Sequence, residues 1–337
     1  MNDELSIREL SHSDLEHYRF AYGLSGISKT QIESDKPQLT LGIFNAAQEI
    51  EAHASAWWTN TPKLNSQSSG LIGHYAAASA TAAHLLIHHM EKVLQQQQCA
   101  YCIAPMNGNT WRSYRFTTEL GDHAPFFLEP YTPPAWAEQF QTANYSALAH
   151  YTSSLAEDMS IRDERIPKIR QRLQPLKIHF RPIQLENFQH DLQHIYNLSV
   201  ASFKHNFLYT DIDFESFSQL YIPVRQYIKP ELTLLAFDGD ILVGFIFAIP
   251  DYLQQGKHDT FIIKTVAISP LRKYAGLGAL LVDQLVDKAQ QLGYRHAIHA
   301  LMHDSNKSLV LSHRYGRPIR GYTLFVKHLQ TNTGIAQ

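Results

Sequence analysis

The sequence predicts an α/β protein with a mixed sheet, built from two copies of one unit. Similar short apolar segments recur in the same order at nearly constant offsets of 193, 195 and 196 residues. Residues 39–44 are similar to 232–237, residues 85–86 to 280–281, and residues 102–106 to 298–302. The length of 337 residues also suggests two domains of about 150 residues each. Chance similarity of short apolar words is the alternative interpretation.

The predicted elements of the second copy alternate between strand and helix patterns. Apolar residues at helical spacing predict helices, and an Asp-Gly turn between two apolar runs predicts a hairpin. In chain order we expect a strand over 176–181, helices over 186–203 and 214–224, a hairpin of 232–237 and 241–249, a strand over 260–268, a helix over 277–292, a strand over 295–302, and a final helix and strands.

Polar and charged residues over 152–176 place the boundary between the copies. The stretch includes Ser153 and Ser154 and is interrupted by Pro167 and Pro175, which is typical of a linker or a solvated helix. We therefore divide the chain into a first domain over 1–155, a linker over 156–175 and a second domain over 176–337.

Composition limits the classes of partner. The formal net charge of −2 argues against nucleic-acid binding through bulk electrostatics, although a local basic patch is still allowed. The polar, acidic start is unlike a signal peptide, and no apolar run approaches the roughly 20 residues of a membrane span. We expect a cytoplasmic protein without a membrane or nucleic-acid partner. The sequence leaves the oligomeric state open.

Residues 265–281 carry the strongest functional signal. A strand ends there, and a helix begins at Gly276 and Gly278. The first N–H groups of a helix have no internal partner and lie at the positive end of its dipole, and glycine lets an anion approach them closely. Arg272 and Lys273 add positive charge, so the segment predicts a diphosphate site. It lacks the third glycine of a dinucleotide fold and the Gly-Lys-Ser/Thr of a Walker loop.

This segment resembles motif A of the GNAT acetyltransferases. The family pattern Arg/Gln-x-x-Gly-x-Gly/Ala has its counterpart in Lys273-x-x-Gly276-x-Gly278, after a similar strand over 266–270. Asn306, Tyr315 and Gly316 are similar to elements of the family's last helix and turn, and the likeness covers about residues 177–329. It implies two GNAT-like units in tandem and binding of acetyl-CoA as co-substrate. The cofactor-binding residues it implies are Val266, Ala267, Ile268, Arg272, Lys273, Tyr274, Ala275, Gly276, Leu277, Gly278, Ala279 and Asn306.

The resemblance also implies a reaction, the transfer of an acetyl group from the thioester to an amine. A backbone N–H near 266–268 would polarise the thioester carbonyl, a base would take the proton of the amine, and an acid would protonate the leaving thiolate. We assign Tyr315 as the acid and His299 or His303 as the base. The acceptor is a small-molecule amine or a peptide, and its identity is open.

Two departures from the family pattern keep other functions open. Ser312 stands where the family's acid tyrosine is expected, and residues 261–265 carry no carboxylate that could act as a base. A protein that binds CoA or a small molecule without turnover is therefore the alternative. Transfer of an aminoacyl or a longer acyl group is a third possibility.

The first copy lacks the features of a diphosphate site. Ala78, Thr81 and Ala83 occupy the positions of Lys273, Gly276 and Gly278. We expect a degenerate first unit, similar in architecture to the tandem design of mycothiol synthase-like transferases, with the acceptor bound between the copies. Asn107, Asn109 and Trp111 would cap a helix or line that cleft, and the run 126–130 is predicted to be core and turn.

Cysteine and histidine patterns give weaker signals. Cys99 and Cys102 are predicted to be small apolar residues of a buried strand, with a redox pair as the alternative. His84 and His88 share a helix face, but no third ligand is placed by spacing. We therefore expect no metal.

Overall fold

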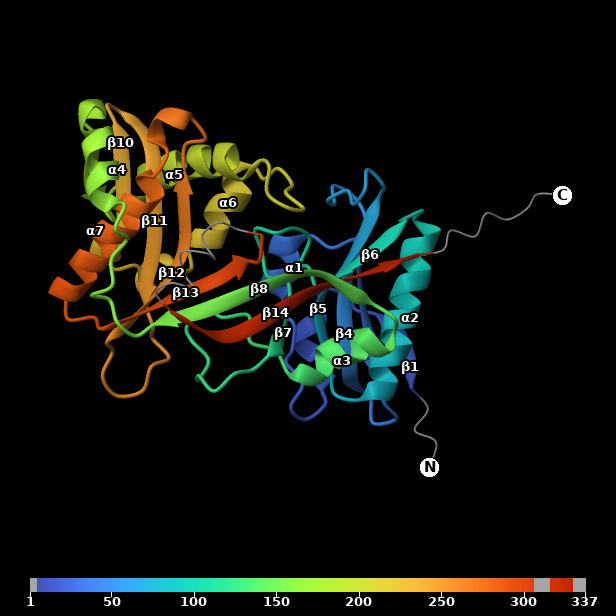
Figure 1. The fold of residues 1–337 in the computed structure, drawn as a ribbon. Coiled ribbons are helices and arrows are strands. Elements are labelled where there is room, and N and C mark those ends of the chain that lie inside the picture. The colour runs from blue at the N-terminus through green and yellow to red at the C-terminus, as the bar shows by residue number, and fades with distance from the viewer. Residues whose placement is uncertain (1–4, 306–315, 330–337) are drawn as a thin grey trace.

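The computed structural model describes residues 5–305 and 316–329 (Figure 1). The elements of its first half are β1 (Ser6–Glu9), β2 (Arg19–Phe20), α1 (Lys29–Asp35), β3 (Leu39–Phe44), β4 (Glu49–Trp57), β5 (Ser69–Ala77), α2 (Ala80–Gln96), β6 (Tyr101–Ala104), β7 (Phe116–Glu119), α3 (Pro134–Thr142) and β8 (Ser146–Ala156).

The second half contains the remaining elements. They are α4 (Ile166–Leu173), β9 (His179–Pro182), α5 (Phe188–Phe203), α6 (Phe214–Tyr221), β10 (Thr233–Asp238), β11 (Ile241–Pro250), β12 (Thr260–Ile268), α7 (Leu277–Gln291), β13 (His296–His303) and β14 (Arg317–His328). The predicted strand over 260–268 is confirmed at both ends, and the hairpin turns at Gly239, whose φ is 59°.

The described strands form one 14-stranded sheet that repeats the same order from each edge. From one edge the order is β1-β3-β4-β5-β6, and from the other it is β9-β10-β11-β12-β13. In both halves the fourth and fifth of these strands are parallel, and the pairs on either side of them are antiparallel. The similar sequence segments of the two copies therefore lie in corresponding strands and helices of two α/β units.

The two halves exchange strands at the centre of the sheet. β14, from the end of the chain, pairs with β6 of the first half, and β8, from the first half, pairs with β13 of the second. β8 and β14 also pair with each other along most of their length, and Figure 1 shows them crossing the middle of the molecule side by side. Phe325 of β14 is buried in the core of the first half. Each half therefore depends on a strand supplied by the other.

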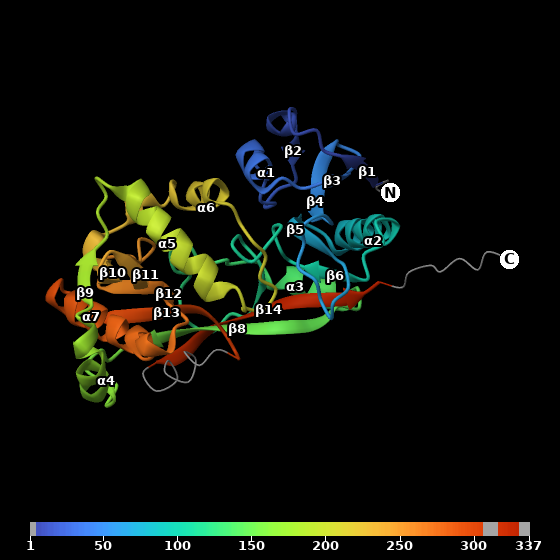
Figure 2. The same cartoon turned by 90° about the horizontal axis from the view of Figure 1, so that it is seen from above.

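Helices cover both faces of the second half of the sheet (Figure 2). α5 and α6 pack on one face with Phe245 and Phe247, and α7 packs on the other with Phe261 and Ile263. The predicted apolar stripe of α7 is confirmed, because Leu277, Leu281, Leu285 and Ala289 are all buried. In the first half, α2 and α3 share one core over β3, β4 and β5.

The segment expected to link the units is structured in part. Ser153 and Ser154 lie buried in β8 at the centre of the sheet, so the prediction that they belong to a polar linker was wrong. The Ser153 hydroxyl accepts a hydrogen bond from the Leu301 amide at 3.0 Å, which allows a serine in a central strand. Beyond β8, α4 packs against α7 through Ile166 and Leu173. β8 of the first half pairs with the second, and β14 of the second half pairs with the first, so no single position in the chain separates the two halves. The division at 156–175 stays a prediction.

The strand predicted over 176–181 begins later than expected. Gln174–Leu176 form a 3-10 turn, and Lys177 has a φ of 50°, in the left-handed region. The backbone becomes extended only after this turn, so β9 starts at His179.

No helix among the described residues is long and apolar enough to cross a membrane.

Strand exchange predicts that the two halves unfold together. Trp57, Trp58 and Trp136 lie in the first half, whereas Trp111 packs on the core of the second, so tryptophan fluorescence reports on the first half in a Trp111→Phe background, which all variants here carry. Leu281→Ala removes a fully buried side chain from the second half and should cost about 2–5 kcal/mol. We expect the urea midpoints of tryptophan fluorescence and of far-UV circular dichroism to fall together. Leu253→Ala, at an exposed leucine, is the control, and an unchanged fluorescence midpoint in Leu281→Ala would contradict the coupling.

Candidate active site

The sheet opens between β12 and β13. The two strands are paired in parallel from Thr260 and His296 up to Ile263 and His299. Beyond this point β12 continues along β11 as far as Ile268, whereas β13 follows β8, pairing His303 with Tyr151. The backbone edge of β12 after Ile263 therefore faces a gap instead of a neighbouring strand.

A bulge and an alternating hydrogen-bond pattern determine which amides face this gap. The pairing of β12 with β11 shifts by one residue at Lys264, which is left without an opposite residue. Further on, the Ser269 amide donates to the Val243 carbonyl at 2.8 Å. Since antiparallel pairs alternate in direction, the amide of Ala267 points toward β11, and those of Val266 and Ile268 point into the gap. The predicted location of the carbonyl-polarising amide therefore has backbone donors available.

The first turn of α7 lies above this open half of β12. A 3-10 turn, η5 (Arg272–Tyr274), leads into Gly276, which precedes the helix with a φ of 85°, a conformation that favours glycine. A Cβ on Gly278 would stand 3.6 Å from Val266 Cγ1. No side chain among the described residues caps the helix start, so the amides of its first turn are available to a ligand.

Charged side chains anchor and surround this helix start. The Lys273 ammonium lies 3.0 Å from the Asp238 carboxylate, and the buried Tyr274 hydroxyl donates to the same oxygen at 2.6 Å. These hydrogen bonds, that of Tyr274 first, lower the pKa of Asp238 and tie η5 to the β10–β11 hairpin. Arg272 is exposed. Arg172 of α4, in the predicted linker, donates a hydrogen bond to the Ala275 carbonyl and adds a cation beside Gly276.

The predicted cofactor residues fall into two groups. One group borders the gap or the helix start with backbone and with exposed or partly buried side chains: Val266, Ile268, Arg272, Lys273, Ala275, Gly276, Gly278 and Ala279. The side chains of Ala267, Tyr274 and Leu277 are buried in the cores and serve packing, which leaves only their backbones for a ligand. Asn306 and Tyr315 lie outside the described residues, so their assignments stay predictions.

The two histidines proposed as bases have different surroundings. His299 is the last β13 residue paired with β12, and burial lowers its pKa to about 4. His303 lies at the end of β13, where its ring centroid is 4.9 Å from that of Tyr151, and burial also lowers its pKa. His299 is therefore neutral near pH 7 and a weak proton acceptor. The assignment of either residue as base stays a prediction.

The corresponding site in the first half is closed. β5 and β6 separate after Leu71 and Ile103, but the chain after β6 fills the gap: the Met106 amide donates to the Ile72 carbonyl at 2.8 Å. The Asn107 side chain accepts from the His74 amide at 2.8 Å. At the start of α2 the Ser79 hydroxyl caps the Ala82 amide and donates to Glu51, which places a carboxylate where an anion would bind. These contacts support the expectation of a degenerate first unit.

Sequence reasoning missed two cations near the gap, Lys264 and Arg115. Lys264 occupies the bulge of β12, and Arg115 reaches from the first half to the Leu301 carbonyl of β13, 3.2 Å away. A lysine within an otherwise apolar predicted strand is a signal that could have identified the first. The position of Arg115 depends on contacts between the halves, which no local pattern reports.

Trp111 and the run 126–130 also connect the halves. The Trp111 indole donates to the Thr210 carbonyl at 2.9 Å and packs against Phe203 of α5. Phe126 is buried in the core of the second half, as the prediction of core and turn requires. Asn109 caps locally, accepting from the Trp111 amide at 3.0 Å.

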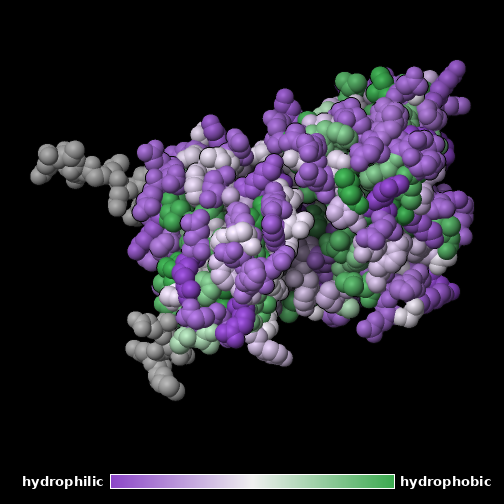
Figure 3. Space-filling model, turned by 180° about the vertical axis from the view of Figure 1, so that it is seen from behind, coloured by the Kyte–Doolittle hydropathy of each residue, from purple (hydrophilic) through white to green (hydrophobic). Residues whose placement is uncertain are grey.

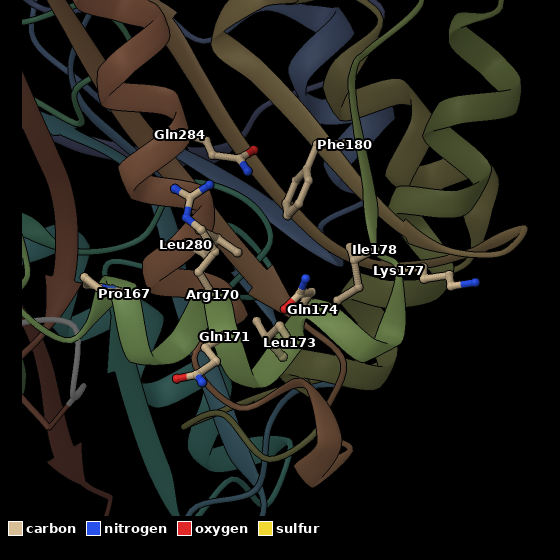
Figure 4. A pocket seen from close by; sticks show the side chains of 10 residues that line it. All are labelled: Pro167, Arg170, Gln171, Leu173, Gln174, Lys177, Ile178, Phe180, Leu280 and Gln284. Atoms are coloured by element: carbon tan, nitrogen blue, oxygen red, sulfur yellow. The ribbon is translucent and has the colours of Figure 1, made fainter.

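A groove of about 630 Å³ lies apart from the strand gap (Figure 4). It runs between α4, β9 and α7, with Leu173, Phe180 and Leu280 among its apolar residues and Arg170 and Lys177 among its polar ones. None of the predicted cofactor residues lines this groove. The site at the start of α7 is therefore defined by backbone donors, not by this cavity.

The remaining candidate residues show no ligand chemistry. Cys99 and Cys102 are buried free thiols, and burial raises the pKa of both, which keeps them in the unreactive protonated form. The rings of His84 and His88 stack at 6.3 Å on the exposed side of α2. Within the described part of the chain, no cluster of three or more His, Cys, Asp or Glu could hold a metal ion. The absence of a metal stays a prediction.

The lowered pKa of His299 predicts a measurable effect on stability. In the unfolded chain a histidine has a pKa near 6.5, so between about pH 6.5 and 4 the unfolded chain binds the extra proton. The contribution of His299 to stability is therefore present above pH 6.5 and lost as the pH falls toward 4. We expect wild type to lose about 2–3 kcal/mol more than His299→Asn across this range, measured by urea unfolding. The exposed His88→Asn is the control, and equal losses in wild type and His299→Asn would refute the assignment.

A protein-family model matches the part of the chain that contains β12, α7 and β13. Residues 192–316 match the model of the acetyltransferase (GNAT) family. No curated protein sequence matches the chain.

Solved structures share the fold over nearly the whole length. A glucosamine N-acetyltransferase region in a fungal multi-domain beta-N-acetylglucosaminidase aligns with a TM-score of 0.57 at 13% identity, covering 97% of this chain and 38% of that one. A conserved protein of unknown function from Enterococcus faecalis, named a probable N-acyltransferase, aligns with a TM-score of 0.57 at 10% identity, covering 98% and 74%. A tandem GNAT protein from the clavulanic acid biosynthesis pathway aligns with a TM-score of 0.51 at 10% identity, covering 97% and 99%. The chain therefore has the mixed α/β fold of these proteins, and its residues 192–316 are similar to the acetyltransferase (GNAT) family.

Proposed function

We propose that this protein is an N-acetyltransferase that binds acetyl-CoA in its second half and transfers the acetyl group to an amine in a ternary complex. The observation that carries the proposal is the gap between β12 and β13, bordered by free amides and by the start of α7. The family domain at 192–316 spans both features. Tandem organisation with one active unit, use of acetyl-CoA and a cytoplasmic location belong to the proposal.

The residues at the start of α7 fit a diphosphate. Backbone N–H groups of residues 277–279 lie at the positive end of the helix dipole, and the missing Cβ of Gly278 leaves room above Val266. Exposed Arg272 and Arg172 add positive charge on either side of the turn. The diphosphate of acetyl-CoA would bind here, and its thioester arm would enter the gap along β12.

The open edge of β12 suits the transfer step. A neutral amine attacks the thioester carbonyl and forms a C–N bond, the C–S bond breaks, the base takes the proton that the amine loses, and the acid protonates the leaving thiolate to give CoA. An amide of Val266 or Ile268 would hold the carbonyl oxygen as it gains negative charge. We keep Tyr315 as the proposed acid. Because His299 is a weak proton acceptor, His303 or a water chain is the better candidate for the base.

A binding protein without turnover is the second candidate. The half of β12 that faces the gap carries no carboxylate among its residues 264–268, and His299 remains neutral near pH 7. Release of free CoA in the presence of amines distinguishes the two functions. Saturable binding of acetyl-CoA without release of CoA in the presence of any amine supports the binding protein without turnover.

Gly278→Glu tests the diphosphate site without relying on damage to the fold. A glutamate in the first turn interacts favourably with the helix dipole, by about 0.3–1 kcal/mol, but repels a diphosphate at the same amides. We expect at least a tenfold weaker affinity for acetyl-CoA by titration calorimetry, with an unchanged or higher urea midpoint.

Gly278→Ala is the matched control. Its Cβ would make only ordinary contacts with Val266 and Ile268, so we expect acetyl-CoA affinity within about threefold of wild type. If Gly278→Glu binds acetyl-CoA as tightly as wild type, the diphosphate does not bind at this helix start, and the proposed function fails.

A further inference from the structure

Two cations without carboxylate partners stand on opposite sides of the strand gap. Lys264 belongs to β12 immediately after the last residue paired with β13, and its ammonium donates to the Leu128 carbonyl at 2.9 Å. Arg115 donates to the Leu301 carbonyl of β13 at 3.2 Å. Among the described residues, no carboxylate oxygen lies within 4.0 Å of either side chain.

Arg115 is removed from water, and Lys264 is partly buried. Arg115 is 7% exposed, and its guanidinium lies 3.9 Å from the ring centres of both Tyr114 and Tyr151. Burial, followed by repulsion from Arg115, lowers the pKa of Lys264 to about 8, although attraction to Glu129 raises it, so the two cations act on each other. Carbonyl groups and aromatic rings offset part of the loss of hydration, but two like charges remain without a counterion.

Nearby acidic groups do not neutralise this pair. The Glu129 side chain is 1% exposed, and its carboxylate is occupied by Arg320 at 2.8 Å and by the Tyr322 hydroxyl at 2.5 Å. Asp304 is exposed after the end of β13, where its charge acts on Tyr151 and His303. Glu129 attracts Lys264 from a distance, but its carboxylate is ion-paired with Arg320, so it is not a direct partner of Lys264 or Arg115.

The backbone around the cations is held in an unusual conformation. Arg115, Leu128 and Leu301 have φ values of 85°, 59° and 59°, in the left-handed region that non-glycine residues rarely adopt. Leu128 and Leu301 are the residues whose carbonyls accept from Lys264 and Arg115. Residues held in such conformations cluster where the surrounding structure fixes a functional group.

The Lys264 side of this pair can be reached from solvent, because Leu128, whose carbonyl accepts from Lys264, is exposed. Figure 3 shows a hollow in the face opposite to that of Figure 1, with apolar residues beside it. Aromatic side chains of the two halves meet nearby, since Trp111 packs against Phe203, and the ring centre of Tyr151 lies 4.9 Å from that of His303. An acceptor that enters between the halves would meet the cations beside the amides of β12.

We infer that the acceptor of the acetyl group carries a carboxylate in addition to its amine, and that Lys264 and Arg115 bind this carboxylate between the two halves. The inference rests on the proposed function for the role of the ligand, but the anion site itself does not require acetyl-CoA. A carboxylate bound here would supply the missing counterion and hold the amine near the open edge of β12.

The first experiment measures anion binding without acetyl-CoA. Saturation-transfer NMR would compare acetate, benzoate and phenylacetate with their neutral amides on wild type and Lys264→Met. We expect saturable transfer to at least one carboxylate and not to its amide, with at least a tenfold weaker affinity in Lys264→Met. Lys257→Met, at an exposed lysine, is the matched control and should bind as wild type.

The second experiment measures CoA release from acetyl-CoA with paired amines. The pairs are β-alanine with β-alaninamide and each α-amino acid with its amide, and phosphoethanolamine tests a phosphate in place of the carboxylate. We expect kcat/KM at least tenfold higher for the carboxylate members in wild type and no such preference in Lys264→Met.

A role in folding alone makes a different prediction for stability. Replacing a partly desolvated charge by methionine should keep or raise the urea midpoint, whereas losing a purely structural contact to Leu128 should lower it. The inference is overturned if wild type binds no carboxylate better than its amide, if phosphoethanolamine alone is preferred, or if Lys264→Met keeps the preference. If acetyl-CoA is not bound or no CoA is released, the proposed function fails, and the NMR experiment still decides the anion site.

Discussion

The separation of β12 from β13 is the constraint on which the rest of the candidate site depends. β13 pairs with β8 of the first half from Ala297 to His303 but with β12 only as far as His299, while β12 remains with β11 up to Ile268. The bulge at Lys264 begins the open segment. The amides of Val266 and Ile268, the first turn of α7 and the two cations all border the resulting gap.

Comparison of the halves shows that the fold alone does not make such a site. β5 and β6 separate in the same way, yet Met106 and Asn107 fill the space and Ser79 caps the helix next to Glu51. A Cβ on Gly73 would collide with the Met106 carbonyl oxygen, so the filling segment lies tight against β5. The same architecture therefore holds an open gap in one half and a packed contact in the other, and the difference comes from a few residues after one strand.

Local patterns predicted most of the second half. The alternation of strands and helices, the Asp-Gly turn at Gly239 and the buried stripe of α7 follow from short-range periodicity and turn chemistry, and the glycines marked the helix start. The strand exchange could not be predicted, because β8 and β14 pair across about 170 residues of sequence and Ser153 resembles a linker residue until its buried partners are known. The position of Arg115 at the gap could not be predicted for the same reason, since its contacts with Leu301 and Tyr151 join segments far apart in the sequence.

The exchange of strands also explains how an acceptor site can include both halves. Loops of the first half bring Arg115 and Leu128 to the open edge of a strand in the second, and the central pair β8 and β14 holds them there. A crystal structure of the protein with CoA tests the central claim most directly. The account predicts diphosphate oxygens within hydrogen-bond distance of the amides of residues 277–279, the thiol arm between β12 and β13, and no CoA at the start of α2. Binding of CoA at α2, or at a place away from the gap, would contradict it.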